Sequence, residues 1–251
     1  YIMRYINQEE LSKIIKEHEL WLKGEGGKRA DLSNTDLNGV NLKGVDLRYS
    51  NLSNANLSNA CLRYADLKYT DLRNAYLRYA DLKFAELEEA DLRRADLGET
   101  NLRYTDLNYA DLEYANLEEA DLRRAKLIGA NLKDIKTNIY TVGYHLACPK
   151  EGSFIGYKKA SKCIVKLLIL DDSKRSSATT AKCRCDKAKV LDIENIETGE
   201  KIKETRSNYN SNFIYKVGEI VSVDNFDNNR WNECTTGIHF FINKENAINY
   251  R

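Results

Sequence analysis

The amino-acid sequence predicts a mainly β protein in which a stack of short repeats lies between an N-terminal helix and a C-terminal α+β domain. Leucine occupies every fifth position from Leu32 to Leu132, which makes 21 consecutive repeats. The 251 residues include one proline, Pro149, and it lies outside the repeats. Segments typical of strands follow the repeats. We therefore expect a leader and capping helix (1–29), a repeat region (30–134), a cap or linker (135–150) and a β-rich C-terminal domain (151–251).

Residues 7–22 are expected to form a helix that covers the hydrophobic column of the first repeats. Asn7 can cap its N-terminus, and Glu10 stands at the capping-box position. Apolar residues recur at helical spacing, and Gly24 ends the pattern. A helix that mediates dimerisation is the alternative, so a homodimer stays open.

The five-residue period fits neither the 3.6-residue period of a helix nor the two-residue period of a strand. A small or β-branched residue stands two positions before each leucine, so the two share one side of an extended segment. A chain that buries this pair and then turns must coil around its own leucines. Stacked coils give each backbone amide a partner, and proline would remove a donor from that ladder. This explains why the repeats contain no proline.

The repeats follow the pattern A-(D/N)-L-x-x, as in residues 65–69 (ADLKY) and 110–114 (ADLEY). This pattern resembles the pentapeptide-repeat family over residues 30–134. The resemblance implies a right-handed quadrilateral β-helix with four repeats per coil, in which residues twenty apart stack on one face. Some members of the family are acidic rods that resemble duplex DNA and bind DNA gyrase.

Stacking at intervals of twenty residues would place basic and aromatic side chains on one face of the rod. The basic residues of this predicted ladder are Lys43, Arg63, Lys83, Arg103 and Arg123, and the aromatic residues beside them are Tyr64, Phe84 and Tyr104. Such a face could bind an acidic protein surface or a phosphate backbone. A solvated face that only keeps the rod in solution is the alternative interpretation.

The charge of the repeats makes imitation of DNA the less favoured alternative. Residues 30–134 contain 14 basic and 19 acidic residues, a net charge of −5. Five coils at ~4.8 Å each would be about 25 Å tall, and duplex DNA of that height carries about 15 negative charges. A DNA mimic that modulates a topoisomerase therefore stays open as an alternative.

The C-terminal segment reads as a β-rich α+β domain. We expect strands at 154–159, 163–170, 189–193, 213–217 and 237–241, followed by a short helix at 243–250. Residues 150–251 contain 18 basic and 14 acidic residues, a net charge of +4. Strands of this kind usually pair in an antiparallel sheet.

Hydroxyl groups and cations between residues 174 and 184 are candidates for phosphate binding, because backbone amides beside lysine and arginine can hold a phosphate. The candidate residues in this domain are Lys174, Arg175, Ser176, Ser177, Thr179, Lys182, Arg184, Trp231 and His239. The predicted ligand is nucleotide-like or another phosphorylated small molecule. An exposed turn rich in serine and threonine is the alternative.

Two weaker resemblances concern the same domain. It is similar to an uncharacterised domain that is often attached to phage pentapeptide repeats. The spacing from Gly237 to Tyr250 also faintly resembles a segment of ADP-ribosyltransferases. In that family a tyrosine stacks on nicotinamide where His239 stands here, and no residue matches the catalytic glutamate.

The cysteines do not form a recognisable metal motif. Zinc sites usually space their cysteines two to four residues apart, whereas Cys183 and Cys185 are separated by one residue. We expect reduced thiols, and metal binding by Cys163, Cys183, Cys185 and Cys234 stays open. No cofactor or metal site is predicted.

These observations favour a non-catalytic interaction protein over an enzyme, since no known catalytic motif is present. A phage or prophage origin would make the partner a host protein or protein complex. Direct binding of nucleic acid and of membranes is not expected, because the bulk charge is near neutral and no apolar run approaches the ~20 residues that cross a bilayer. The expected location is the cytoplasm of a bacterial host.

Overall fold

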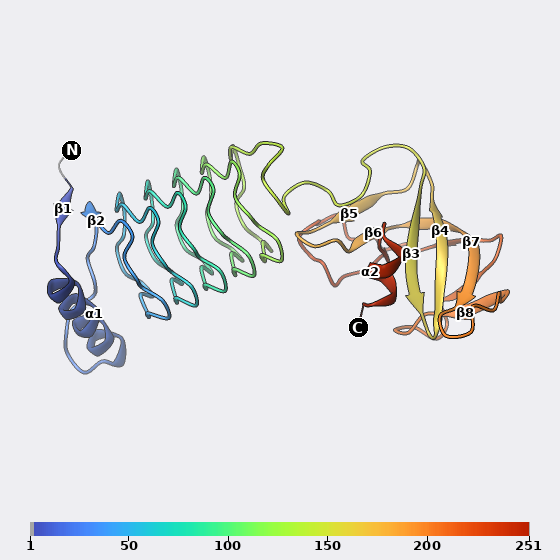
Figure 1. Ribbon diagram of the computed structural model, residues 1–251, viewed down its shortest axis with the longest axis horizontal. Coiled ribbons are helices and arrows are strands. Elements are labelled where there is room, and N and C mark those ends of the chain that lie inside the picture. Colours follow the sequence, from blue (N-terminus) through green and yellow to red (C-terminus); the bar gives the residue numbers. More distant parts are fainter. Residues whose placement is uncertain (1–2, 251) are drawn as a thin grey trace. The chain divides into compact units, whose positions relative to one another are not determined.

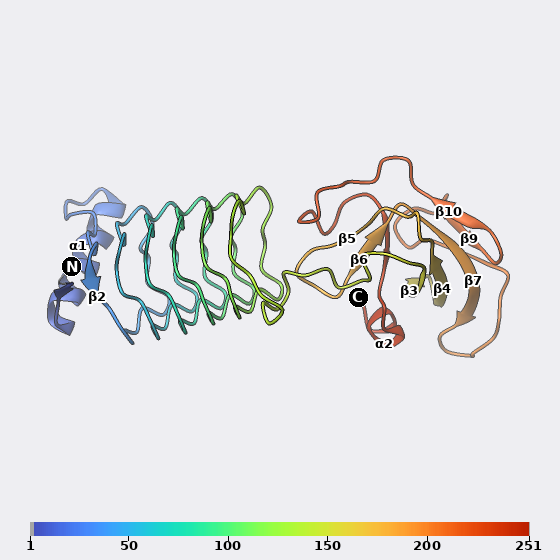
Figure 2. The ribbon, with the colours of Figure 1, turned by 90° about the horizontal axis from the view of Figure 1, so that it is seen from above.

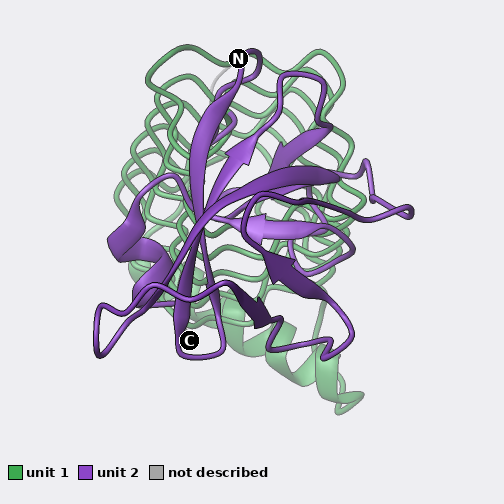
Figure 3. Cartoon of the chain, turned by 90° about the vertical axis from the view of Figure 1, so that its right-hand side faces the viewer, with its two compact units in different colours: residues 1–145 green, residues 146–251 purple. Residues whose placement is uncertain are grey.

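The computed structural model describes residues 3–250, and the chain divides into two compact units, Tyr1–His145 and Leu146–Arg251 (Figure 3). The first unit contains the N-terminal helix and the repeats. The second unit contains two sheets, a two-stranded hairpin and a short helix. Each unit has its own core, so each is described by itself.

The N-terminal helix α1 spans Gln8–Lys23 and confirms the expected helix. The Asn7 side chain accepts a hydrogen bond from the Glu10 amide, and Gly24 adopts the left-handed conformation at the C-terminal cap. The Glu10 side chain is paired with Arg4. The preceding strand β1 (Arg4–Tyr5) pairs in parallel with β2 (Thr35–Asp36), which attaches the start of the chain to the first coil.

His18 joins α1 to the beginning of the repeats. Its side chain is fully buried, and Nδ1 accepts a hydrogen bond from the Ala30 amide at 3.1 Å. Burial lowers the pKa of His18, because the charged imidazolium would lose its hydration. The helix therefore packs on the first coil through a neutral histidine, at the blue end of the ribbon in Figure 1.

The repeats form coils of twenty residues. Parallel bridges join residues twenty apart, from Asp31–Asn51 to Asn116–Lys136. Four pentapeptides therefore complete one coil, as the resemblance implies. The repeat leucines from Leu32 to Leu127 are buried, and successive coils stack along the unit (Figures 1 and 2). The residue two positions after most leucines has a positive φ, for example 59° at Tyr64, and this turns the chain at each corner.

The hydrogen-bonded ladder extends beyond the last repeat leucine. The Leu117 amide donates to the Lys136 carbonyl, and the Leu122 amide donates to the Val142 carbonyl, both at 2.8 Å. Asp121 bridges to Val142, so this coil contains one extra residue. The buried Thr141 hydroxyl donates to the Leu117 carbonyl at 2.9 Å. The first part of segment 135–150 thus continues the coil, and the second unit begins at Leu146.

The second unit contains a four-stranded and a three-stranded antiparallel sheet (Figure 2). The larger sheet has the order β10-β7-β4-β3, with the strands Ile220–Ser222, Lys187–Asn195, Cys163–Ile169 and Phe154–Ala160. The smaller sheet has the order β11-β6-β5, with the strands Ile238–Phe240, Cys183–Cys185 and Arg175–Ser177. A bridge between Tyr157 and Phe241 joins β3 to the chain just after β11.

The remaining elements of the second unit are a hairpin and a helix. Strands β8 (Glu204–Arg206) and β9 (Ile214–Lys216) form the hairpin, and helix α2 (Lys244–Ile248) packs against β3. The five expected strands and the terminal helix are present. Sequence reasoning missed β5, β6, β8 and β10, each of which is three residues long.

Candidate binding sites

The predicted ladder forms one face of the first unit. We call residues 41–44, 61–64, 81–84, 101–104 and 121–124 the basic face, since each segment lies twenty residues after the previous one. The rings of Tyr64, Phe84 and Tyr104 stack at centroid distances of 5.0 and 4.8 Å. The Lys83 ammonium lies 5.0 Å from the Phe84 ring centroid, a cation–π distance. The structure thus brings the predicted basic and aromatic residues together.

The basic face carries an excess of positive charge. It holds six basic side chains and two acidic ones, Asp81 and Asp121. Arg63 and Arg103 lie 3.8 and 3.9 Å from these carboxylates, too far for a hydrogen bond. The Nε atoms of both arginines are buried without a hydrogen-bond partner. Only Arg123 makes a close pair, at 2.6 Å from Asp121. Most of this positive charge is therefore not neutralised by a short ion pair on the same face.

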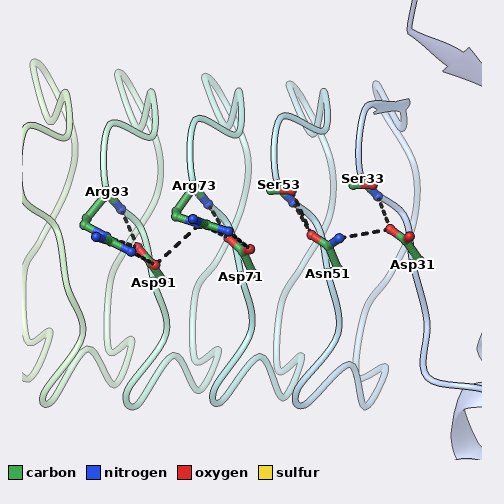
Figure 4. Close-up of polar contacts among 8 residues, drawn as sticks. All are labelled: Asp31, Ser33, Asn51, Ser53, Asp71, Arg73, Asp91 and Arg93. Carbon is green, nitrogen blue, oxygen red and sulfur yellow. Dashed lines mark hydrogen bonds and ion pairs between the residues drawn. The ribbon is translucent and has the colours of Figure 1, made fainter.

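The face half a coil away, on the opposite side of the repeats, has its cations arranged differently (Figure 4). We call it the paired face, and it comprises Asp31, Ser33, Asn51, Ser53, Asp71, Arg73, Asp91 and Arg93. Arg73 donates two hydrogen bonds to Asp71, at 2.9 and 2.6 Å, and Arg93 donates two to Asp91. The Arg73 hydrogen bonds hold the pKa of Asp71 below its usual range. The cations of this face are thus already paired.

The arginines of the second unit that were predicted to bind phosphate contact backbone carbonyls instead. Arg184 is 2% exposed and donates to the carbonyls of Asp227, Asn229 and Thr236. Arg175 donates to four carbonyls between Gly152 and Ser173 at 2.7–3.1 Å. Both guanidinium groups therefore hold loops in place.

The hydroxyl groups of the same segment are also placed differently from the expected exposed turn. Ser176 and Ser177 are buried in β5, and the Ser177 hydroxyl accepts a hydrogen bond from the Ala147 amide. Thr179 is buried, whereas Lys174 is exposed. The alternative interpretation, an exposed turn in this stretch, is wrong for residues 175–177, because they pair with β6 as a strand. The structure does not gather this set around one cavity.

The second unit contains a cleft of about 700 Å³. Of the nine residues predicted in this domain, only Lys182 and His239 line it. Trp231 lies outside the lining and stacks with the Arg230 guanidinium at 4.2 Å from the ring centroid. The other lining residues that matter chemically are Lys158, Lys159, Asn208, Tyr209, Asn210, Phe213, Asn225, Phe241 and Tyr250.

The cleft is basic, and the pKa values of its ionisable side chains are shifted in different directions. Burial lowers the pKa of Lys158 to about 8. Burial would also lower the pKa of Lys182, but its hydrogen bond to the Tyr250 hydroxyl and the nearby Glu233 raise it. Burial and the neighbouring lysines lower the pKa of His239 to about 4, so this histidine is neutral at pH 7. No aspartate or glutamate is among the lining residues described for the cleft.

Sequence reasoning missed Lys158. This lysine is 8% exposed and lies at a buried position of β3, between the buried residues Gly156 and Ala160. The signal was available in the alternation of that strand. A lysine at an inward position between two small residues is unusual, because charged side chains are rarely buried without a partner. The segment was interpreted only as a strand.

The cysteines take structural positions in the core. Cys163, Cys183 and Cys185 are buried among aliphatic side chains, and burial raises the pKa of Cys185 well above its ordinary value. Cys234 is exposed and lines the cleft. Within residues 3–250, no group of three or more histidine, cysteine, aspartate or glutamate side chains is placed to hold a metal ion.

A family model for pentapeptide repeats matches residues 28–63, 62–94 and 95–134. The chain belongs to the pentapeptide-repeat family. A separate model, described as a family of unknown function (DUF5758), matches residues 144–247. No curated protein matches the chain. None of the helices formed by residues 3–250 has the length and apolar character that a membrane crossing requires.

Solved pentapeptide-repeat proteins match the repeat unit. Rfr23 from the cyanobacterium Cyanothece 51142 is 30% identical; the match covers 52% of this chain and 97% of Rfr23, with a TM-score of 0.45. HetL, involved in heterocyst differentiation regulation in Nostoc sp. strain PCC 7120, is 36% identical over 43% of this chain and 58% of HetL, with a TM-score of 0.28. A thylakoid lumen protein from Arabidopsis thaliana is 32% identical over 39% of this chain and 65% of its own, with a TM-score of 0.32.

Proposed function

We propose that this pentapeptide-repeat protein is a non-catalytic interaction protein whose basic face binds an acidic surface of a partner protein. The observation that carries the proposal is the excess of positive charge on that face. The repeat unit is net negative, yet six basic side chains and two acidic ones share the basic face. An acidic partner surface would be attracted to this face and repelled by the others.

The stacked rings support the same proposal. Tyr64, Phe84 and Tyr104 form a continuous aromatic column beside the cations. Aromatic residues and arginine are enriched at protein–protein interfaces, where they supply much of the binding energy. The C-terminal domain is similar to one that is often attached to phage pentapeptide repeats. A phage or prophage origin would make the partner a host protein.

The charge distribution favours this proposal over imitation of DNA. A DNA mimic presents negative charge along its length, whereas the basic face interrupts the acidic surface through five coils. A topoisomerase partner would therefore have to contact the remaining faces only. The two proposals place the contact on different sides of the repeat unit.

Charge reversal on matched faces tests the proposal. The full chain is used to capture proteins from a bacterial lysate, and the bound proteins are identified by mass spectrometry. The variant R63E/R103E on the basic face should lose the partner, and capture by the unchanged protein should weaken as salt increases. The control R73E/R93E changes the net charge equally on the paired face and should keep the partner. A partner that both variants retain would exclude the basic face as the binding surface.

A further inference from the structure

The cleft of the second unit is lined by a largely buried lysine whose ammonium group has no partner among the described residues. Lys158 is 8% exposed, lines the cleft, and forms no hydrogen bond or ion pair with any residue of the described chain. A buried charge without a partner is unfavourable, because it gives up its hydration without receiving a hydrogen bond or a counter-charge. The site is therefore incomplete in a way that an anion would correct.

The second lysine of the cleft is held in place by neighbours. Lys182 is 6% exposed, and its ammonium nitrogen lies 3.2 Å from the Tyr250 hydroxyl and 3.5 Å from the Cys234 sulfur. Neither of these groups neutralises its charge in the protonated state. Lys158 and Lys182 thus supply two positive charges to one cavity whose described lining contains no carboxylate, and Glu233, which acts on Lys182, lies outside that lining. A ligand with more than one negative charge fits this arrangement better than a neutral one.

The rest of the lining is suited to a planar ring. Tyr209, Phe213, Phe241 and Tyr250 supply aromatic surface, on which flat rings stack regardless of their exact identity. The side-chain amides of Asn208, Asn210 and Asn225 offer both donors and acceptors to the edge of such a ring. The volume of about 700 Å³ lies within the range of roughly 300–1,000 Å³ that small-molecule sites occupy.

The shape of the cleft also depends on a constrained glycine. Gly237 has φ 147°, and a Cβ atom at this position would lie 3.2 Å from the Arg184 Cβ. Arg184 in turn donates to the carbonyls of Asn229 and Thr236 on either side of this loop. The wall next to His239 is therefore held by the fold before any ligand arrives, and this reduces the entropic cost of binding.

We propose that the cleft binds a mononucleotide, with Lys158 and Lys182 neutralising its phosphate and the aromatic lining contacting its base. This site is independent of the basic face, since all of its residues belong to the second unit. The proposal is for binding alone and includes no covalent step.

Calorimetric titration of the full chain tests the ligand class. The probes are AMP, GMP, CMP and UMP, with adenosine and inorganic phosphate as partial ligands. We expect at least one mononucleotide to bind at least tenfold more tightly than either partial ligand. Absence of binding by all four mononucleotides, or equal binding of inorganic phosphate alone, would overturn the proposal.

Replacement of Lys158 separates a ligand-binding lysine from a structural one. The variant Lys158→Met keeps the length of the side chain and removes its charge. We expect it to weaken mononucleotide binding at least tenfold and to raise the melting temperature of the ligand-free protein. The matched control Lys166→Met, on the neighbouring strand β4 and outside the cleft, should bind within twofold of the unchanged protein. Unchanged affinity, or a lower melting temperature, in Lys158→Met would contradict the assigned role.

Discussion

The two units of this protein place their polar groups in opposite locations. In the repeat unit, leucine and small residues fill the interior, and charged side chains point outward. In the second unit, Lys158, Lys182 and Arg184 are buried between or beside the sheets. A coil of twenty residues has an interior that four leucines and four small side chains already fill, so only its faces can bind a partner. Two sheets that meet at an angle can leave a cleft, and binding groups can then lie inside.

The two units also differ in how the hydrogen-bonding groups of the backbone find partners. The repeat unit uses the next coil, since the Leu62 amide donates to the Asp81 carbonyl and the Asp81 amide donates to the Ala60 carbonyl. The second unit uses side chains for part of this task, and Arg184 alone serves three carbonyls. Loss of one side chain should therefore lower the free energy of unfolding for a different reason in each unit.

The largest expected effect is the loss of one core leucine from the repeat unit. Leu82 is 1% exposed, and Leu82→Ala should destabilise the unit by about 3 kcal/mol, because a cavity remains in a column that cannot collapse sideways. Chemical unfolding can be followed at Trp21 in a Trp231→Phe background. Leu191→Ala, at a position 36% exposed on β7 of the second unit, is the control. Followed at Trp231 in a Trp21→Phe background, it should cost less than about 1 kcal/mol. Equal effects of the two changes would contradict the comparison.

A smaller loss is expected when a buried side chain that serves the backbone is removed from the second unit. Arg184→Met should cost about 2 kcal/mol, because buried carbonyl groups would lose their donors. Unfolding followed at Trp231 in a Trp21→Phe background measures this effect. Lys174→Met changes the same charge at an exposed position and should have almost no effect. A change below about 0.5 kcal/mol for Arg184→Met, the size that is usual for surface substitutions, would mean that other groups replace the arginine as hydrogen-bond donors.

The pH dependence of stability should reveal the buried lysine. The pKa of Lys158 is about 8 in the folded protein and should return to its ordinary, higher value on unfolding. Between these values the unfolded chain binds more protons, so stability should rise as pH increases from about 8 to 10. The unfolding free energy of the unchanged protein should gain about 2 kcal/mol relative to Lys158→Met over this range. Parallel pH profiles for the two proteins would show that the ammonium group has a partner.

The smallest expected effect concerns the corners of the repeat unit. Glu89 has a φ of 56°, a conformation that side chains with a Cβ atom disfavour, whereas its neighbour Glu88 does not have a positive φ. Glu89→Gly should stabilise the unit by about 0.5 kcal/mol, because glycine adopts this conformation without strain. Glu88→Gly should destabilise it by a similar amount, since glycine only adds freedom to the unfolded chain there. The two melting temperatures should therefore shift in opposite directions.

The sequence by itself determined the repeat unit almost residue by residue. The five-residue period located the buried leucines. The resemblance to the pentapeptide-repeat family implied the pairing at intervals of twenty residues, which places Arg63, Arg103 and Tyr64 on one face. This succeeded because each contact in a coil is repeated in the next, so the periodicity of the sequence already describes the tertiary structure. The cap at Asn7 was predictable for a similar reason, since its partner is three residues away.

Only the tertiary structure decided which residues of the second unit surround a cleft. The candidate stretch from Arg175 to Arg184 turned out to serve carbonyls and the core, whereas Lys158 and Tyr250 meet Lys182 from distant parts of the chain. Contacts such as Lys159 with Ile248 join residues 89 apart, and no spacing in the sequence encodes them. In a periodic coil the repeat itself predicts which residues are neighbours. In a domain held together by long-range pairing, the binding groups come together only when the whole chain has folded.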